Sequence, residues 1–245
     1  MNIAVIFAGG SGQRMHTRDV PKQFLLIHNK PVIIYTLEWF DRHPDIDAIV
    51  VACKEDTIDF LNELIYKYRI EKVQAVVPGG KTGQMSIYNG LVAAKEVADR
   101  AGEKDAIVLI HDGVRPLINT KVITDNIDSV KKNGSAITTG LVTETVLVID
   151  NNRTIDYVPD REKSRVAKAP QSFWLNDILK AHQKAQHDGL YNCIDSCTMM
   201  KGYGYSLYLV DGPSENIKIT TQRDFYTMRA ILDAREDRQL YEGEF

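Results

Sequence analysis

The sequence has few cysteines, little net charge and no long apolar run. Its 245 residues include three cysteines, and 30 basic against 33 acidic side chains leave a formal net charge of −3. Cys193 and Cys197 have no second pair, and His187 alone cannot complete a zinc site, so we expect reduced, unligated thiols. The charge balance disfavours nucleic acid or an anionic membrane as a partner, and the local basic character near the N-terminus suggests a small anionic ligand.

No segment approaches the roughly 20 consecutive apolar residues of a membrane span. The first residues also lack the charged region, apolar core and cleavage site of a secretory signal, so we expect a cytoplasmic protein. A hydrophobic content of 44% provides ample core, and the chain contains no linker, repeat or low-complexity segment. We therefore expect a single domain over residues 1–245.

What the sequence does contain is an apolar run at residues 3–7, followed by a glycine-rich loop, AGGSG at residues 8–12. An unbroken apolar run of this length is typical of a strand covered on both faces of a parallel sheet. The loop glycines leave backbone N–H groups uncovered, and Arg14, Arg18 and Lys22 follow as cations. The stretch predicts a phosphate-binding loop. The alternative is a glycine-rich turn with solvated basic residues.

Two common phosphate motifs are excluded at this loop. Met15 stands where the dinucleotide pattern G-x-G-x-x-G needs its third glycine, and QRM at residues 13–15 stands where a P-loop needs G-K-[ST]. A second loop, PGGKT at residues 78–82, looks like the end of a P-loop, but the first glycine of that pattern would fall on Ala75. Paired glycines followed by Ser86 at a helix start suit a base or a ribose instead.

Apolar strand-like runs alternate with amphipathic helical stretches along most of the chain. Strands are expected at residues 49–52, 73–77, 106–110, 136–142 and 206–210, and helices after Pro31, after a cap at Asp56, at residues 86–101, 120–132 and 175–186, and after a capping box of Thr221 and Asp224. This alternation predicts an α/β fold, a parallel sheet with helices on both faces and right-handed crossovers. Ligands of such sheets bind at the C-terminal ends of the strands.

The alternation breaks at two β-rich runs, residues 145–149 and 154–158, which are joined by DNNR at residues 150–153. This pattern is typical of a β-hairpin. A hairpin arm at about residues 143–160 has little core to pack on, and isolated hairpins are marginal in water. We therefore expect the arm to dock against a second subunit. The alternative is that it folds back over its own sheet.

Charged residues also lie near the expected strand ends. Asp112 leaves an apolar strand and suits a hard cation such as Mg²⁺, and Arg115 suits a phosphate, although Asp112 also fits a simple turn cap. His111 is expected to be packed or hydrogen-bonded rather than a ligand. The cations of residues 161–168 suit an anionic group of a second substrate or solvated surface charge. Lys218 alternates with two isoleucines, and strand geometry turns it either into a site or out to water.

Four motifs together resemble a known enzyme family. They are AGGSGQRM with PKQF within residues 8–24, HDGVRP at 111–116, APQSF at 169–173 and ENIKIT at 215–220. In this order they resemble the family that contains 2-C-methyl-D-erythritol 4-phosphate cytidylyltransferase and ribitol-5-phosphate cytidylyltransferase, over nearly the whole chain. The resemblance implies a Rossmann-like, mostly parallel sheet, a homodimer joined through the hairpin arms, and use of CTP with Mg²⁺.

The resemblance also implies a role for each matching residue. The catalytic residues are Arg14, Lys22 and Lys218, which contact the triphosphate, and the metal ligand is Asp112. The nucleotide-binding residues are Ala8, Gly9, Gly10, Gly12, Gly80, Ser86 and Asp112. The residues that contact the polyol phosphate are Arg115, Thr145, Arg161 and Asp195.

The chain departs from the family pattern at Gly83, where arginine is common, and at Ala169, where threonine is common. IDSC at residues 194–197 is closer to the T-D-x-C of ribitol-type enzymes than to the T-D-E-A-S of the erythritol type. This favours CTP-dependent conversion of D-ribitol 5-phosphate to CDP-ribitol, which supplies cell-surface polymers. The alternatives are the erythritol-type enzyme of isoprenoid synthesis, a sugar-1-phosphate nucleotidyltransferase using UTP or GTP, and a nucleotide-binding module without turnover.

Overall fold

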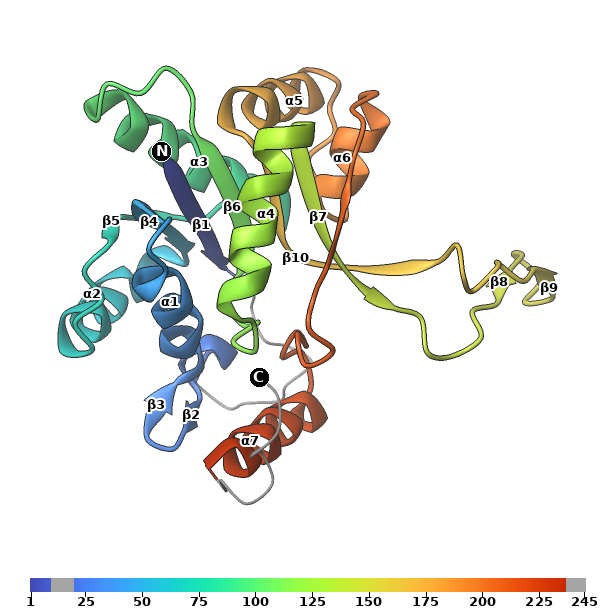
Figure 1. The fold of residues 1–245 in the computed structure, drawn as a ribbon, viewed down its shortest axis with the longest axis horizontal. Coiled ribbons are helices and arrows are strands. Elements are labelled where there is room, and N and C mark those ends of the chain that lie inside the picture. Colours follow the sequence, from blue (N-terminus) through green and yellow to red (C-terminus); the bar gives the residue numbers. More distant parts are fainter. Residues whose placement is uncertain (10–19, 237–245) are drawn as a thin grey trace.

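A computed structural model describes residues 1–9 and 20–236. Its centre is a seven-stranded sheet with the order β11-β7-β10-β6-β1-β4-β5 (Figure 1). The strands are β1 (Asn2–Ala8), β4 (Ala48–Cys53), β5 (Val73–Pro78), β6 (Ile107–Asp112), β7 (Ser135–Leu141), β10 (Arg165–Trp174) and β11 (Leu209–Asp211). The helices are α1 (Val32–Arg42), α2 (Ile58–Lys67), α3 (Gly83–Arg100), α4 (Thr120–Asn133), α5 (Leu175–His187), α6 (Ser196–Gly202) and α7 (Gln222–Glu236).

Helices cover both faces of the sheet because successive side chains of each central strand point to opposite sides. On β1, Ala4 and Ile6 pack with buried residues of α1, α2 and α4. Ile3 and Val5 point the other way and pack with buried residues of α3, α5 and α6. β1 pairs in parallel with both β4 and β6. The predicted α/β architecture, a mostly parallel sheet between two helical layers, is confirmed.

β10 runs antiparallel to both of its neighbours, β6 and β7, and the sequence analysis predicted no strand there. Its first half is exposed and carries the cations Arg165 and Lys168, so no apolar run marks it. Its centre contains Pro170, a residue that argues against a strand in the middle of a sheet. The pairing with β7 shifts register between Ala167 and Gln171, and this irregularity accommodates the proline.

Two helix starts differ from the predictions. α3 begins at Gly83 rather than at Ser86, because the side chain of Thr82 accepts a backbone hydrogen bond and caps the helix. Asp56 does not cap α2, since it lies inside a short 3-10 turn (Glu55–Thr57) and the helix that follows has no side-chain cap. Both errors follow from placing the helix start by residue type alone.

The last helix, α7, begins as predicted. The Asp224 carboxylate accepts from the Thr221 backbone N–H at 2.7 Å, and the Asp224 N–H donates to the Thr221 hydroxyl at 3.3 Å, which is a capping box. A two-stranded ribbon, β2 (Leu26–Ile27) with β3 (Lys30–Pro31), follows a 3-10 turn (Lys22–Phe24). In the part of the chain that the structure describes, no helix has the length and apolarity needed to cross a membrane.

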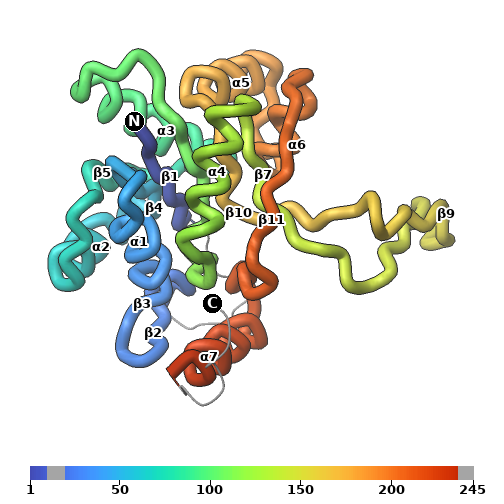
Figure 2. The backbone as a smooth tube through the Cα atoms, viewed as in Figure 1, coloured from blue at the N-terminus to red at the C-terminus, as the bar shows by residue number. Residues whose placement is uncertain are grey.

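The residues between β7 and β10 form an arm that projects from the body of the molecule (Figures 1 and 2). It carries the hairpin of β8 (Val148–Ile149) and β9 (Ile155–Tyr157). The Asp150 carboxylate closes the turn by accepting backbone N–H groups of Asn152 and Thr154, both at 2.9 Å. The predicted hairpin is confirmed, with shorter strands, and the alternative that it folds back over its own sheet is wrong.

Candidate active site

Asp112 occupies the C-terminal end of β6 and is only 6% exposed. Its Oδ1 lies 2.5 Å from the Lys218 Nζ, and its Oδ2 accepts from the Arg115 Nε at 2.8 Å. Burial by itself raises the pKa of a carboxyl, but the two cations outweigh burial and hold the pKa of Asp112 below its usual range. The carboxylate is therefore ionised at neutral pH and fixed between two positive groups.

Lys218 reaches Asp112 from a loop, so the predicted strand geometry around it is wrong, although its side chain does turn toward Asp112 and line the cavity. The loop is held from several sides. Asn216 is buried and donates to the carbonyl of Ala169 at 2.7 Å, while its own carbonyl accepts from Arg115 at 3.1 Å. Lys22 donates to the carbonyl of Ile219 at 3.1 Å. Parts of all four motifs found in the sequence therefore meet at one place.

His111 lies beside Asp112 on β6 but faces the interior. It is fully buried, and its Nε2 pairs with the carbonyl of Arg115 at 3.0 Å. Burial lowers the pKa of His111 to about 4, so the ring is neutral at pH 7. The expectation that His111 is a packed, hydrogen-bonded histidine is confirmed.

The loop before α3 and the end of β1 converge on Ser86. The Ser86 hydroxyl accepts from the Gly80 N–H at 3.0 Å and donates to the Thr82 carbonyl at 2.9 Å. A Cβ on Gly9 would lie 3.2 Å from the Ser86 Oγ, and one on Gly79 would lie 2.9 Å from it. Side chains at these two positions would crowd the serine, so glycine permits the close approach. Ser86 thus shapes the loop through contacts within it.

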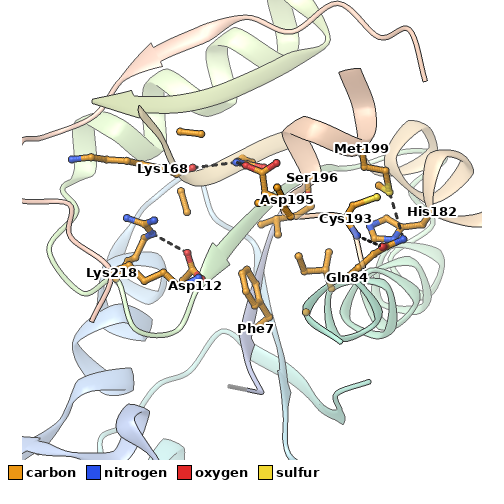
Figure 3. A pocket seen from close by; sticks show the side chains of 18 residues that line it. Phe7, Gln84, Asp112, Lys168, His182, Cys193, Asp195, Ser196, Met199 and Lys218 are labelled. Atoms are coloured by element: carbon orange, nitrogen blue, oxygen red, sulfur yellow. Dashed lines mark hydrogen bonds and ion pairs between the residues drawn. The ribbon is translucent and has the colours of Figure 1, made fainter. Parts of the chain in front are cut away.

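A cavity of about 320 Å³ lies at this edge of the sheet (Figure 3). We call one part of its lining the cationic end, which consists of Asp112, Arg115, Lys168 and Lys218. The opposite part, which we call the neutral end, consists of Gln84, His182, Cys193 and Met199. The predicted residues Asp112, Arg115, Asp195 and Lys218 all line this one cavity.

Asp195 lies between the two ends and starts α6. Its Oδ1 accepts from the Thr198 backbone N–H at 2.8 Å, which caps the helix, and its Oδ2 accepts from the Gln171 amide at 2.9 Å. Lys168 donates to the carbonyls of Pro213 and Ser214 at 3.4 and 3.3 Å, and its burial together with the nearby Arg115 lowers its pKa. The cationic end therefore holds three cations against one carboxylate.

Several predicted residues lie elsewhere. Thr145 and Arg161 are on the arm, where the Arg161 Nη2 donates to the Thr145 hydroxyl at 2.8 Å, and neither lines the cavity of its own chain. Ala8 is the last residue of β1, and Gly9 follows it and lies beside Ser86. Gly10, Gly12 and Arg14 fall outside the described residues.

The residues of the neutral end were missed. Gln84 and His182 occupy buried positions on α3 and α5, where the helical pattern of the sequence predicts only core packing. APQSF at residues 169–173 was found as a motif, but the contact of its glutamine with Asp195 was not predicted. Nothing in the sequence alone brings residues 84 and 182 together.

Comparison with known proteins agrees with this geometry. The family model described as "IspD: 2-C-methyl-D-erythritol 4-phosphate cytidylyltransferase" matches residues 2–234. A ribitol-5-phosphate cytidylyltransferase of Vibrio parahaemolyticus is 54% identical over 98% of this chain and 100% of its own. A 2-C-methyl-D-erythritol 4-phosphate cytidylyltransferase of Clostridium acetobutylicum is 37% identical over 95% of this chain and 97% of its own.

Among solved structures, the 4-diphosphocytidyl-2C-methyl-D-erythritol synthase of Anaerococcus prevotii superposes with a TM-score of 0.80 at 26% identity. The match covers 95% of this chain and 96% of that one. The sheet order, the four motifs at one strand edge and these similarities agree. The chain belongs to the IspD family of cytidylyltransferases.

Proposed function

We propose that this protein transfers CMP from CTP to D-ribitol 5-phosphate, forming CDP-ribitol and pyrophosphate. The observation that carries the choice of acceptor is the identity of 54% to a relative named for ribitol 5-phosphate, against 37% to one named for methylerythritol phosphate. The cationic end of the cavity supplies the charge that a polyol phosphate and a nucleoside triphosphate require.

The reaction needs positive charge rather than a base or a nucleophilic side chain. An oxygen of the acceptor phosphate attacks the α-phosphorus of CTP, and the bond to the pyrophosphate leaving group breaks. The attacking phosphate is already ionised at neutral pH, so catalysis consists of positioning and of stabilising the charge that develops. Lys22, from the 3-10 turn that precedes β2, and Lys218, from the loop between β11 and α7, supply that charge. Arg115 positions the acceptor phosphate.

Asp112 is the residue that would hold a magnesium ion. Mg²⁺ is commonly bound by one or two carboxylates together with substrate phosphates and water, and Asp112 is an ionised carboxylate at the strand end. Among the described residues no group of three or more His, Cys, Asp or Glu side chains could hold a metal. Bound Mg²⁺ would neutralise phosphate charge, and the lowered pKa of Asp112 keeps the carboxylate in the ionised form that a cation requires.

We also propose that two chains form a homodimer through their arms. The arm exposes several large apolar side chains: Val146, Leu147, Ile149, Ile155, Tyr157 and Val158. Exposed apolar surface of this kind marks an interaction site. Thr145 and Arg161 lie on the same arm, away from the cavity of their own chain, so they would reach an acceptor only in the cavity of the partner.

A cytoplasmic location agrees with three free cysteines and a CTP substrate.

The experiment that tests the function measures pyrophosphate release by the purified protein with CTP and Mg²⁺. D-ribitol 5-phosphate and 2-C-methyl-D-erythritol 4-phosphate are compared at equal concentration. We expect a higher kcat/KM with ribitol phosphate. Faster turnover of methylerythritol phosphate would transfer the assignment to the second candidate, which the family model's own name supports. CTP binding without pyrophosphate release with either acceptor would indicate a nucleotide-binding module.

A further inference from the structure

The neutral end of the cavity is a built and buried surface. Gln84, His182 and Met199 are 5%, 1% and 3% exposed, and they come from three different helices, α3, α5 and α6. Cys193 comes from the loop between α5 and α6. Figure 3 shows these side chains together, across the cavity from Lys218 and Asp112. No charged side chain belongs to this end.

Gln84 fixes the wall of the neutral end. Its Oε1 accepts from the Cys193 backbone N–H at 2.8 Å, and its Nε2 donates to the Leu190 carbonyl at 2.7 Å. The side-chain amide therefore ties the loop that carries Cys193 to the start of α3. Thr82 adds a second tie, because its hydroxyl donates to the Tyr191 carbonyl at 2.6 Å.

His182 differs from Gln84 because neither of its ring nitrogens has a hydrogen-bond partner among the described residues. Buried polar groups without partners are rare and costly, so an unpaired one that lines a cavity points to a ligand. Burial lowers the pKa of His182 to about 4, and the ring is neutral at pH 7. A neutral imidazole offers one N–H donor and one acceptor nitrogen, the pairing that suits a hydroxyl group.

We propose that the neutral end binds the hydroxyl groups of the acceptor, with His182 as the hydrogen-bonding residue that selects a polyol chain. This inference rests on the proposed function. The acceptor phosphate lies at the cationic end, and its uncharged chain extends past Asp195 to His182. Ribitol carries a hydroxyl on every carbon of an unbranched chain, whereas methylerythritol has a methyl branch. The His182 ring, which offers both a donor and an acceptor, therefore favours ribitol, because it can pair with a hydroxyl group and cannot pair with a methyl group.

The test replaces His182 with a ring of similar shape that has no nitrogen. We expect His182→Phe to raise the KM for D-ribitol 5-phosphate about tenfold, the effect of losing one buried hydrogen bond, and to leave the KM for CTP unchanged. The same variant should raise Tm by about 2–4 °C, because an unpaired polar group is no longer buried in the free protein. His182→Gln keeps a donor and an acceptor, so we expect it to retain a KM close to that of the wild type.

His43→Phe is the matched control, because His43 is 2% exposed but lies outside the cavity, with its Nε2 at 3.0 Å from the Thr124 hydroxyl. It should lower Tm and leave both KM values unchanged. An unchanged KM for ribitol phosphate in His182→Phe, or an equal rise in the KM for CTP, would overturn the inference. If the wild type releases no pyrophosphate with ribitol phosphate, the proposed function fails instead, and this outcome is seen before any variant is made.

Discussion

Lys22 is a cation whose removal should lower the reaction rate directly. Its Nζ donates to the carbonyl of Ile219, the residue after Lys218, which itself pairs with Asp112. We expect Lys22→Ala and Arg14→Ala each to lower kcat by about 10²-fold or more, the usual effect of removing one preorganised charge contact. Steady-state pyrophosphate release measures this directly.

Lys30→Ala is the matched control for these variants. Lys30 is half-buried and pairs with Glu38 at 2.9 Å, but it does not line the cavity. It should keep kcat within about twofold of the wild type, since the substitution removes only a partly exposed ion pair that contributes little to stability and lies outside the cavity. Near-normal turnover by both the Lys22 and Arg14 variants would contradict the catalytic assignment.

Asp112 is expected to make the stability of the fold depend on pH. Asp112→Asn leaves Lys218 and Arg115 without their carboxylate, so we expect the free energy of unfolding at pH 7 to fall by about 2 kcal/mol. The pKa of Asp112 is lower in the folded protein than in the unfolded chain. Its contribution to stability is therefore complete above the unfolded pKa of about 3.9 and is lost as pH falls through the folded pKa.

Urea unfolding of both proteins between pH 7 and pH 3 measures this effect. The difference in unfolding free energy should stay constant down to about pH 5 and shrink below pH 4, because the unfolded wild-type chain then binds a proton at Asp112 that the folded protein does not. A difference that persisted unchanged to pH 3 would mean that the ion pairs do not account for the loss.

The turn between β5 and α3 depends on glycine at position 80. A Cβ there would lie 2.3 Å from the Met85 Cβ and 2.8 Å from a Met85 backbone carbon, too close for any accommodation without moving the turn. We expect Gly80→Ala to displace the loop and raise the KM for CTP about tenfold or more. Gly202→Ala is the control, because no atom lies within 4 Å of its added Cβ. A normal KM for CTP in Gly80→Ala would separate this loop from the nucleotide site.

The elements that the sequence predicted correctly are those marked by one uninterrupted apolar run or one local pattern. β1, β4 and β6 are unbroken apolar runs buried on both faces, and the capping box of α7 is a local pattern. β10 was missed because Pro170, the exposed Arg165 and the partly buried Lys168 interrupt its signal, and α6 was missed because it has only seven residues. In both cases long-range pairing or packing, absent from the local sequence, decides the structure.

The residues of the candidate site also fall into two groups, those that the sequence predicted and those that it did not. Asp112 and Arg115 were predicted because charged residues after an apolar strand are conspicuous, and Lys218 because it interrupts an apolar stretch within the ENIKIT motif. The strand end and the loop bring the three within hydrogen-bond distance. Gln84 and His182 were not predicted, because a buried polar residue on an amphipathic helix has the same spacing as core. Only the packing of α3 against α5 reveals that they line a cavity.

The proposed dimer predicts that two inactive variants regain activity when they are mixed, which a site built from a single chain could not do. Arg161 lies on the arm and Lys218 lies in the cavity, so a complete site would combine Lys218 of one chain with Arg161 of the other. Arg161→Ala and Lys218→Ala homodimers should each be nearly inactive. When the two are mixed under conditions that exchange subunits, half of the dimers become mixed by random assortment. Each mixed dimer then has one site with both residues intact.

We therefore expect the mixture to recover about a quarter of wild-type activity, since half of the dimers carry one complete site in two. Pyrophosphate release after mixing measures the recovery, and native mass spectrometry of the two variants counts the mixed dimers. The control mixes Lys218→Ala with Lys22→Ala, because Lys22 bonds the Ile219 carbonyl beside Lys218 of its own chain, so every site stays defective and the mixture should recover nothing. If mixed dimers form and the Arg161 and Lys218 pair remains inactive, Arg161 does not act across the interface, and the arm serves assembly alone.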